Sequence, residues 1–251
     1  MRTPIAAFLA VLWWIGPALA AERQSCAIPG YLLFGSNELK KVSAAVNKER
    51  RLTIAVVGTG SSILAGPDGP RSAYPARLEA ALAHRVPSVA VKVVTLVRSR
   101  QTAEDLAPGM AKLLIDEKPD LVIWQTGTID AIRRIDPDAF RDALEHGVDS
   151  LHKGGADVVL MNMQYSPRTE SMIAVGPYAD VMRVVAQQHE IPLFDRLAIM
   201  HHWSDVGAFD LYAAGKDNML AQRVHDCIGR AIAALIIDAG HLQASAVRAG
   251  Q

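Results

Sequence analysis

The sequence predicts an α/β protein, a three-layer α/β/α sandwich around a central, mostly parallel sheet of five strands. Segments of strand character alternate with segments of helix character along the chain, which is the pattern of parallel α/β folds. The strand segments are short apolar runs, typical of strands buried on both faces. The chain has 251 residues and half of them are hydrophobic, enough for one sizeable core and too little to require two. The pattern leaves the order of the strands open.

The first half of the chain supplies three strands. Charged residues over Asn37–Arg51 are spaced as on a surface helix, with Asn37 as a candidate cap. A second helix over Thr102–Asp116 is marked by Thr102 as N-cap and Asp105 at the third helical position. The other elements predicted here are the strands Thr53–Val57, Val89–Leu96 and Leu121–Gln125 and the helix Tyr74–Ala83.

The second half supplies the remaining two strands. A long helix over Pro137–Lys153 is predicted to end at Gly154-Gly155, a C-terminal stop signal. The other elements are the strands Asp157–Met163 and Ile191–Phe194 and the helices Tyr178–His189 and Asp217–Ala239.

Residues 1–20 are predicted to be a signal peptide. Arg2 supplies a short positive region, Ile5–Gly16 an apolar region, and Ala18-Leu19-Ala20 a cleavage site. The alternative is an uncleaved membrane anchor, but the apolar stretch is short for a span and runs into Pro17. We therefore expect a periplasmic or secreted protein without a membrane span after cleavage. It divides into an N-terminal extension with a helix at 21–50, one domain at 51–240 and a tail at 241–251.

Charge and cysteine content limit the partners and the compartment. Lys+Arg and Asp+Glu are both 26, and this balance, with few aromatic residues, argues against a nucleic-acid-binding protein. The two cysteines are Cys26 and Cys227. In the oxidising compartment that export implies, they are predicted to form one disulfide between the mature N-terminus and the last helix. The alternative is two buried thiols acting as small apolar residues.

A turn rich in glycine and serine, Gly60–Gly66, follows the first predicted strand. Nucleophiles and ligand-binding loops of open α/β sheets lie beyond the carboxyl ends of strands, so a serine here is well placed for chemistry. The turn is not a P-loop, because no Gly-Lys-[Ser/Thr] follows, and Ile63 holds the third glycine position of the dinucleotide fingerprint. The alternative is that Ser61 and Ser62 cap a helix or tighten a turn.

In the order and spacing of three such segments the chain resembles the SGNH/GDSL hydrolase family. The family's first block, Gly-Asp-Ser-Leu-Thr-x-Gly, corresponds to Gly60–Gly66 and puts the nucleophile position on Ser62. The second block, an Asn followed by a Gly, falls on Thr95 and Arg100, and the third, Gly-x-Asn-Asp, on Gly127–Asp130. The resemblance runs from about Leu52 to Ala234 and implies an SGNH or flavodoxin-like fold.

The catalytic blocks depart from the family's pattern. In the family a histidine takes the serine proton, and the oxyanion is held by two backbone N–H groups and the third-block asparagine. Here Ile129 replaces that asparagine, which leaves the backbone N–H groups of Ser62 and Arg100 as oxyanion donors. The Asp-x-x-His pattern before the last helix is also missing, because Asp217 is followed three residues later by Leu220.

Three histidines remain as candidates for the base. His225 lies about two helical turns beyond the expected position, and we expect it to point elsewhere. His201 and His202 precede this region, and with Asp205 and Asp210 they suggest a metal site. Adjacent histidines in a strand would point to opposite faces and no H-E-x-x-H is present, so we expect no metal and no cofactor.

The resemblance implies an exported ester or acyl hydrolase, with Ser62 as nucleophile, an ester or acylated carbohydrate as substrate, and activity weak or lost. The alternative is a non-catalytic envelope protein that binds a polar or acylated glycan, or a protein partner, in the same cleft. The rim of the site is predicted to comprise Ser61, Gly127, Ile129, Asp130, Gln164 and Asp217.

Overall fold

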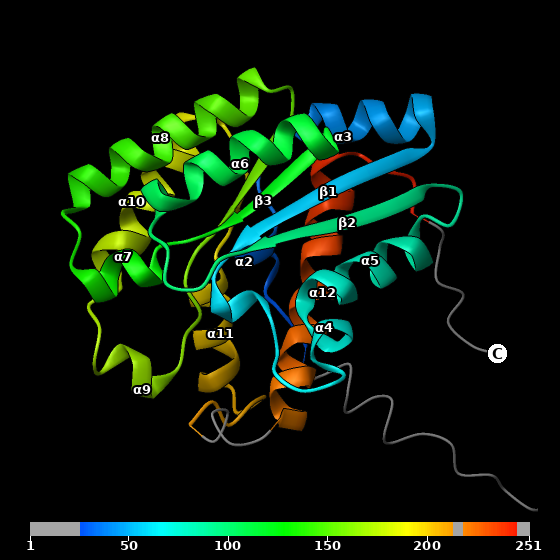
Figure 1. Cartoon of the computed structure of the whole chain (residues 1–251). Coiled ribbons are helices and arrows are strands. Elements are labelled where there is room, and N and C mark those ends of the chain that lie inside the picture. Colours follow the sequence, from blue (N-terminus) through cyan, green and yellow to red (C-terminus); the bar gives the residue numbers. More distant parts are fainter. Residues whose placement is uncertain (1–25, 213–217, 245–251) are drawn as a thin grey trace, which may run out of the picture.

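A computed structural model describes residues 26–212 and 218–244 of the chain (Figure 1). Five strands form one sheet in the order β2-β1-β3-β4-β5, and every neighbouring pair is parallel. This is the flavodoxin-like strand order. The predicted fold class is confirmed, and the mostly parallel sheet is wholly parallel. The strands are β1 (Arg51–Gly58), β2 (Ala90–Val97), β3 (Leu121–Gln125), β4 (Asp157–Met161) and β5 (Leu193–Phe194).

Helices cover both faces of the sheet (Figure 1). One face packs against α6 (Ala103–Glu117), α8 (Pro137–Lys153) and α10 (Gly176–Gln188). The other face packs against α5 (Tyr74–Arg85) and α12 (Asn218–Ala239), and the short helix α3 (Lys40–Ala44) belongs to the same core. Each face therefore has its own hydrophobic core.

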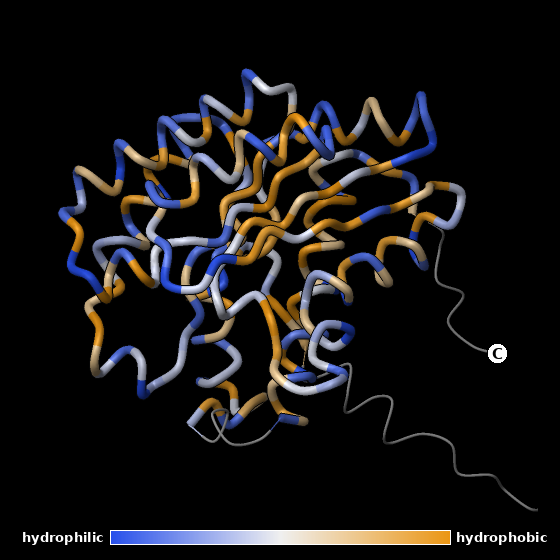
Figure 2. The backbone as a smooth tube through the Cα atoms, in the orientation of Figure 1, coloured by the Kyte–Doolittle hydropathy of each residue, from blue (hydrophilic) through white to orange (hydrophobic). Residues whose placement is uncertain are grey.

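Strand β1 serves both cores because its side chains alternate in direction. Leu52, Ile54 and Val56 belong to the α5/α12 core, and Ala55 and Val57 to the α6/α8/α10 core. Figure 2 shows the result: hydrophobic residues run through the strands, and hydrophilic residues occur along the outer helices. A near-continuous apolar run is what such a doubly buried strand requires.

Most predicted elements are present, but five helices were missed and the first one differs. The structure ends the regular helix α3 early and continues it as a π-helical turn over Ala45–Glu49. The additional helices are α2 (Gly30–Leu33), α4 (Gly69–Ser72), α7 (Thr128–Arg133), α9 (Pro167–Glu170) and α11 (Arg196–Asp205). The sequence assigned His201 and His202 to no predicted element, and the structure places both in α11.

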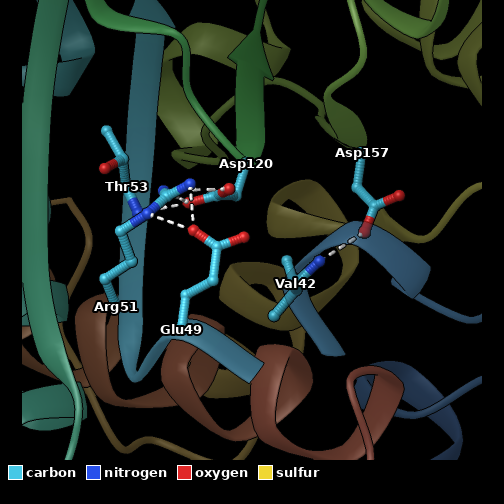
Figure 3. A network of polar contacts seen from close by, with 6 residues as sticks. All are labelled: Val42, Glu49, Arg51, Thr53, Asp120 and Asp157. Atoms are coloured by element: carbon cyan, nitrogen blue, oxygen red, sulfur yellow. Dashed lines mark hydrogen bonds and ion pairs between the residues drawn. The ribbon is translucent and has the colours of Figure 1, made fainter. Parts of the chain in front are cut away.

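Two aspartates hold the amino-terminal edge of the sheet together (Figure 3). Asp120 accepts hydrogen bonds from the Thr53 N–H at 2.8 Å and from the Arg51 guanidinium at 2.9 Å. Asp157 accepts from the Val42 N–H at 3.0 Å, at the start of α3. These contacts place a structural network at the edge opposite to the ligand-binding edge expected for this fold.

The predicted disulfide is present and joins Cys26 to Cys227 on α12. The residue that follows Cys26 is held as well, because the Trp203 indole N–H donates a hydrogen bond to the Ala27 carbonyl at 3.0 Å. In the part of the chain that the structure describes, no helix is long and apolar enough to cross a membrane. The predicted signal peptide lies outside the described residues.

Candidate functional site

A cavity of about 400 Å³ opens at the carboxyl edge of the sheet. Its walls come from the turn after β1, the loop after β4, and the helices α11 and α12. Polar side chains in the walls include Ser61, Gln164, Arg196 and His225, and apolar ones include Met200 and Val224. No aspartate or glutamate occurs among the described residues that line it. The cavity therefore combines cationic, neutral polar and apolar surface.

Ser62 does not line this cavity; it lines a smaller one, of about 150 Å³, together with Thr95. The Ser62 side chain is fully buried, and its hydroxyl donates to Gln125 Oε1 at 2.9 Å. The Tyr74 hydroxyl lies 3.0 Å from Ser62 Oγ and must be the donor there, since the single Ser62 proton is already given to an amide oxygen. The Ser62 N–H donates to the Thr59 carbonyl at 2.9 Å. Both groups that a nucleophilic serine would use are thus engaged within the fold.

Glycine at position 58 permits this arrangement. A Cβ atom there would collide with Ser62 Oγ and approach Gln125 Oε1. The turn therefore packs its second serine against the strand end, and its first serine, Ser61, lines the cavity. The nucleophile role of Ser62 stays a prediction.

Arg100 has the backbone of a glycine position. Its φ of 63° is in the left-handed region, which an arginine adopts at a cost and a glycine freely. Its carbonyl accepts a hydrogen bond from the Arg133 guanidinium at 2.7 Å. Arg100 is exposed and is not among the residues lining the cavity.

The third predicted block forms a tight turn at the end of β3. Gly127 has a φ of 95°, and a Cβ there would meet Met163 Sδ. Asp130 is buried and accepts from the Ala103 N–H at 2.9 Å and the Gly127 N–H at 3.2 Å. Burial raises the pKa of Asp130, against the hydrogen bonds that lower it. Asp130 thus joins the starts of α6 and α7, while Ile129 is half-buried outside the cavity lining.

Replacing Asp130 with alanine is expected to lower the free energy of unfolding by about 2–3 kcal/mol, because two backbone N–H groups lose a buried acceptor. Urea unfolding followed by circular dichroism measures the change. Asp136→Ala is the control, since it removes the exposed cap of α8 and should cost only about 1 kcal/mol. Equal losses in the two variants would contradict the anchoring role.

His225 lines the cavity and is held as a neutral ring. Its Nδ1 accepts a hydrogen bond from the Tyr74 backbone N–H at 3.0 Å, so the ring proton must reside on Nε2. Burial, with a contribution from the Arg196 charge, lowers the pKa of His225 to about 3. In this tautomer no ring lone pair is free to accept a proton from a serine.

The other histidine candidates lie elsewhere. His201 Nδ1 is 2.8 Å from Asp205 Oδ2, and the His201 ring lies 4.7 Å from that of Tyr165. Neither His201 nor His202 lines the cavity. Within residues 26–212 and 218–244, no group of three or more His, Cys, Asp or Glu side chains is placed to hold a metal ion. Asp217 lies outside these ranges.

Arg196 is the residue that sequence reasoning missed. It is the first residue of α11, just after β5, and its side chain is 1% exposed. It donates to the Ser61 carbonyl and hydroxyl at 3.3 Å each, and to Gln164 Oε1 at 3.3 Å. The only signal in the sequence is an arginine directly after a short apolar strand, which does not distinguish a buried cation from an exposed one.

Comparison with known proteins identifies the family. The model of the Non-GDSL lipase-like family matches residues 25–242. The chain belongs to this family. The resemblance to SGNH/GDSL hydrolases is thereby confirmed.

Solved structures share the fold of this Non-GDSL lipase-like protein. A variant of Axe2, an acetyl-xylooligosaccharide esterase from Geobacillus stearothermophilus, matches with a TM-score of 0.60 and 18% identity over 74% of this chain and 94% of that chain. LAE5, an alpha/beta hydrolase enzyme from the metagenome of Lake Arreo, Spain, matches with a TM-score of 0.58 and 20% identity over 77% of this chain and 97% of that chain. At these identities the likeness shows the fold. A comparison with curated proteins found no match.

Two ionisable side chains of this Non-GDSL lipase-like protein, a histidine and an arginine, line the cavity from buried positions. The one histidine that lines the cavity, among the described residues, carries its proton on Nε2 and has Nδ1 occupied. The charged group that lines the cavity from within the protein is Arg196. Such a lining is suited to binding and orienting a polar ligand.

Proposed function

We propose that this chain is an exported SGNH-fold protein that binds a polar ligand in its cleft and has lost serine-hydrolase turnover. One observation carries the proposal. Within the described residues, neither Ser61 nor Ser62 forms a hydrogen bond with a histidine. A serine needs an adjacent base to become a nucleophile at neutral pH, and a nucleophile–base contact of about 2.6–3.2 Å is the mark of such a site.

The oxyanion side of the site supports the same proposal. The Ser62 N–H is already donated to the Thr59 carbonyl, and Ile129 has no side-chain donor. The loss of one oxyanion donor reduces kcat by about 10²–10³-fold in a working serine hydrolase. A cleft without the base and these donors retains little of the rate enhancement of a serine hydrolase over the uncatalysed reaction.

Export is supported by two independent features. The signal-peptide pattern of residues 1–20 directs the chain out of the cytoplasm. The Cys26–Cys227 disulfide is the kind of bond that persists in an oxidising compartment. We therefore place the protein in the periplasm or outside the cell.

A second candidate function is weak ester or acyl hydrolysis. It is favoured by the Ser61 hydroxyl, which lines the cavity 3.3 Å from an Arg196 guanidinium nitrogen. A cation at that distance favours a serine alkoxide over the neutral hydroxyl. Substrates would be short esters that fit the cavity beside Ser61.

Ester hydrolysis by the purified protein is expected to remain at the level of the uncatalysed reaction. The measurement is the release of p-nitrophenol from p-nitrophenyl acetate and butyrate by the unmodified protein and by Ser61→Ala and Ser62→Ala variants. Circular dichroism must show that each variant is folded, because Ser62→Ala removes two buried hydrogen bonds. We expect the same slow rate from all three proteins.

The two serine variants separate the two candidate functions. Turnover well above background that disappears in Ser62→Ala alone would identify Ser62 as the nucleophile and contradict the proposed non-catalytic function. Turnover that disappears in Ser61→Ala alone would establish the second candidate. Rates that are indifferent to both substitutions support the non-catalytic function.

A further inference from the structure

Among the described residues, Arg196 is a buried cation without an anionic partner. Its side chain is 1% exposed, and the groups that it contacts are a serine, a glutamine and the ring of Tyr74, 5.9 Å from the guanidinium carbon. None of these is a carboxylate, and Arg196 forms no salt bridge within the described ranges. Buried charges in proteins are normally paired, so this one calls for an explanation.

The guanidinium also has hydrogen-bonding capacity to spare. Its three hydrogen bonds use at most three of the five N–H donors of an arginine. Arg196 Nε is buried with no partner in the described structure. An arginine with unused donors matches an anion that presents two oxygens side by side.

The surroundings of Arg196 are positive and half apolar. The cavity that it lines has a second arginine, Arg168, at its exposed side, and no described acidic residue in its walls. His225 is neutral there, and its Nε2–H is an additional donor. The apolar part of the wall includes Ile63, Leu64, Met200, Leu211 and Val224.

We propose that this cavity binds an oxyanion, a carboxylate or a phosphate, carried on a short apolar group, with Arg196 as the residue that anchors the anion. The inference rests on the proposed function, since it names the ligand class of the same cleft. The apolar wall receives the chain of the ligand and the Arg196 end receives its charged head. A volume of about 400 Å³ accommodates a ligand of that size.

The charge of Arg196 is retained in the cavity. Burial lowers the pKa of Arg196 to about 10, so the guanidinium stays protonated at neutral pH. Its desolvation is then a free-energy cost of the ligand-free protein that an incoming anion offsets. This makes the charge of the ligand head the main determinant of binding.

Calorimetric titration of the purified full-length mature protein tests the proposal with four matched ligands: hexanoate, hexyl phosphate, 1-hexanol and hexylammonium. We expect at least one of the two oxyanions to bind with a Kd on the order of 1 mM or tighter, and hexanol and hexylammonium to bind far more weakly. Preference between hexanoate and hexyl phosphate then identifies the head group. Equal binding of hexanol and both anions, or no binding of either anion, would overturn the proposal.

Arg196→Met tests the anchor, and Arg133→Met is its control. Arg133 lies at the same edge of the sheet but is exposed and paired with Asp105 at 3.1 Å. Arg196→Met should raise the Kd of the bound anion about thirtyfold or more, and Arg133→Met should leave it unchanged. Because Arg196→Met removes an unpaired buried charge, we expect it to melt at or above the temperature of the unmodified protein. A purely structural role of Arg196 predicts the opposite shift in melting temperature.

A second variant keeps the test decisive if Arg196→Met does not fold. Ala221 is a half-buried residue of α12 that lines the cavity, so Ala221→Phe fills it without changing its charge. Anion binding should be lost in this variant, and undiminished binding would place the ligand elsewhere. The outcome is separable from that of the ester assay, because anion binding can fail in a protein without turnover and can persist in one that hydrolyses esters.

Discussion

Removal of the Cys26–Cys227 disulfide is expected to lower the free energy of unfolding by about 4 kcal/mol. The bond closes a loop between residues 201 positions apart, which is nearly the whole folded chain. Cross-linking residues so far apart removes much of the conformational freedom of the unfolded chain. The chain-entropy model gives about 5 kcal/mol for a loop of this length, and the removal of native disulfides typically costs about 2–5 kcal/mol. In the native state the Cα atoms of the two cysteines are 5.3 Å apart, within the ordinary range for a disulfide.

Guanidinium unfolding with and without a reducing agent measures this effect. The matched variant combines Cys26→Ser with Cys227→Ala, because the first side chain is half-buried and the second is buried. Its stability should equal that of the reduced protein and should not respond to the reducing agent. A loss below about 1 kcal/mol would mean that the unfolded chain gains little freedom when the bond opens, against the entropic account.

Elements with strong local signals were predictable almost to the residue. The strand Leu121–Gln125 and the helix Pro137–Lys153 have the predicted bounds, because turn and stop residues flank them. The predicted N-cap of α6 is also confirmed, since Thr102 and Asp105 form a reciprocal capping box. In these segments the same few residues that start or stop an element in the structure are visible in the sequence.

Elements shaped by tertiary packing were not predictable. Helix α11 buries Arg196, Ile199, Met200 and Trp203, which lie on one face of the helix. An arginine on the buried face, and Leu197 and Ala198 outside it, weaken the apolar pattern in the sequence. What makes it helical is Asp195, which caps it by accepting from the Ala198 N–H, together with its packing in the core. A local pattern carries little of that information.

The site shows the same division. The turn sequence indicates a serine at the strand end. Only the packing of α5 against α12 brings the Tyr74 hydroxyl to Ser62 and the Tyr74 backbone N–H to His225. Which of two adjacent serines lines the cavity depends on that contact. The buried Arg196 likewise depends on helices and loops far apart in the chain. The sequence therefore predicted the edge of the sheet that carries the site better than it predicted the chemistry there.

Acid is expected to destabilise the protein through His225 by about 3 kcal/mol between pH 7 and pH 4. The pKa of His225 is about 3 in the folded protein and about 6.5 in the unfolded chain. Between these two pH values the unfolded chain binds a proton that the folded protein does not. The contribution of His225 to the free energy of unfolding is therefore fully present above pH 6.5 and decreases as the pH falls. Each bound proton contributes about 1.4 kcal/mol per pH unit.

Other groups contribute to the same pH range, so the comparison with a variant isolates His225. Burial lowers the pKa of His152, which adds to the stability lost in acid. Burial raises the pKa values of Asp130 and Asp157, and this partly offsets the loss of stability. His225→Asn keeps an acceptor for the Tyr74 N–H, because the asparagine oxygen takes the place of Nδ1, but it cannot titrate.

The free energy of unfolding of both proteins is measured in urea at steps of about one pH unit from 7 to 4. His225→Asn should be the less stable protein at pH 7, where it lacks the packing of the ring, and the difference should narrow by about 3 kcal/mol at pH 4. His84→Asn on the exposed end of α5 is the control, and its curve should run parallel to that of the unmodified protein. A constant difference between His225→Asn and the unmodified protein would mean that the ring accepts a proton in the folded state. His225 would then be available as a base, and the Ser61 hydroxyl that shares its cavity would regain the partner that hydrolysis requires.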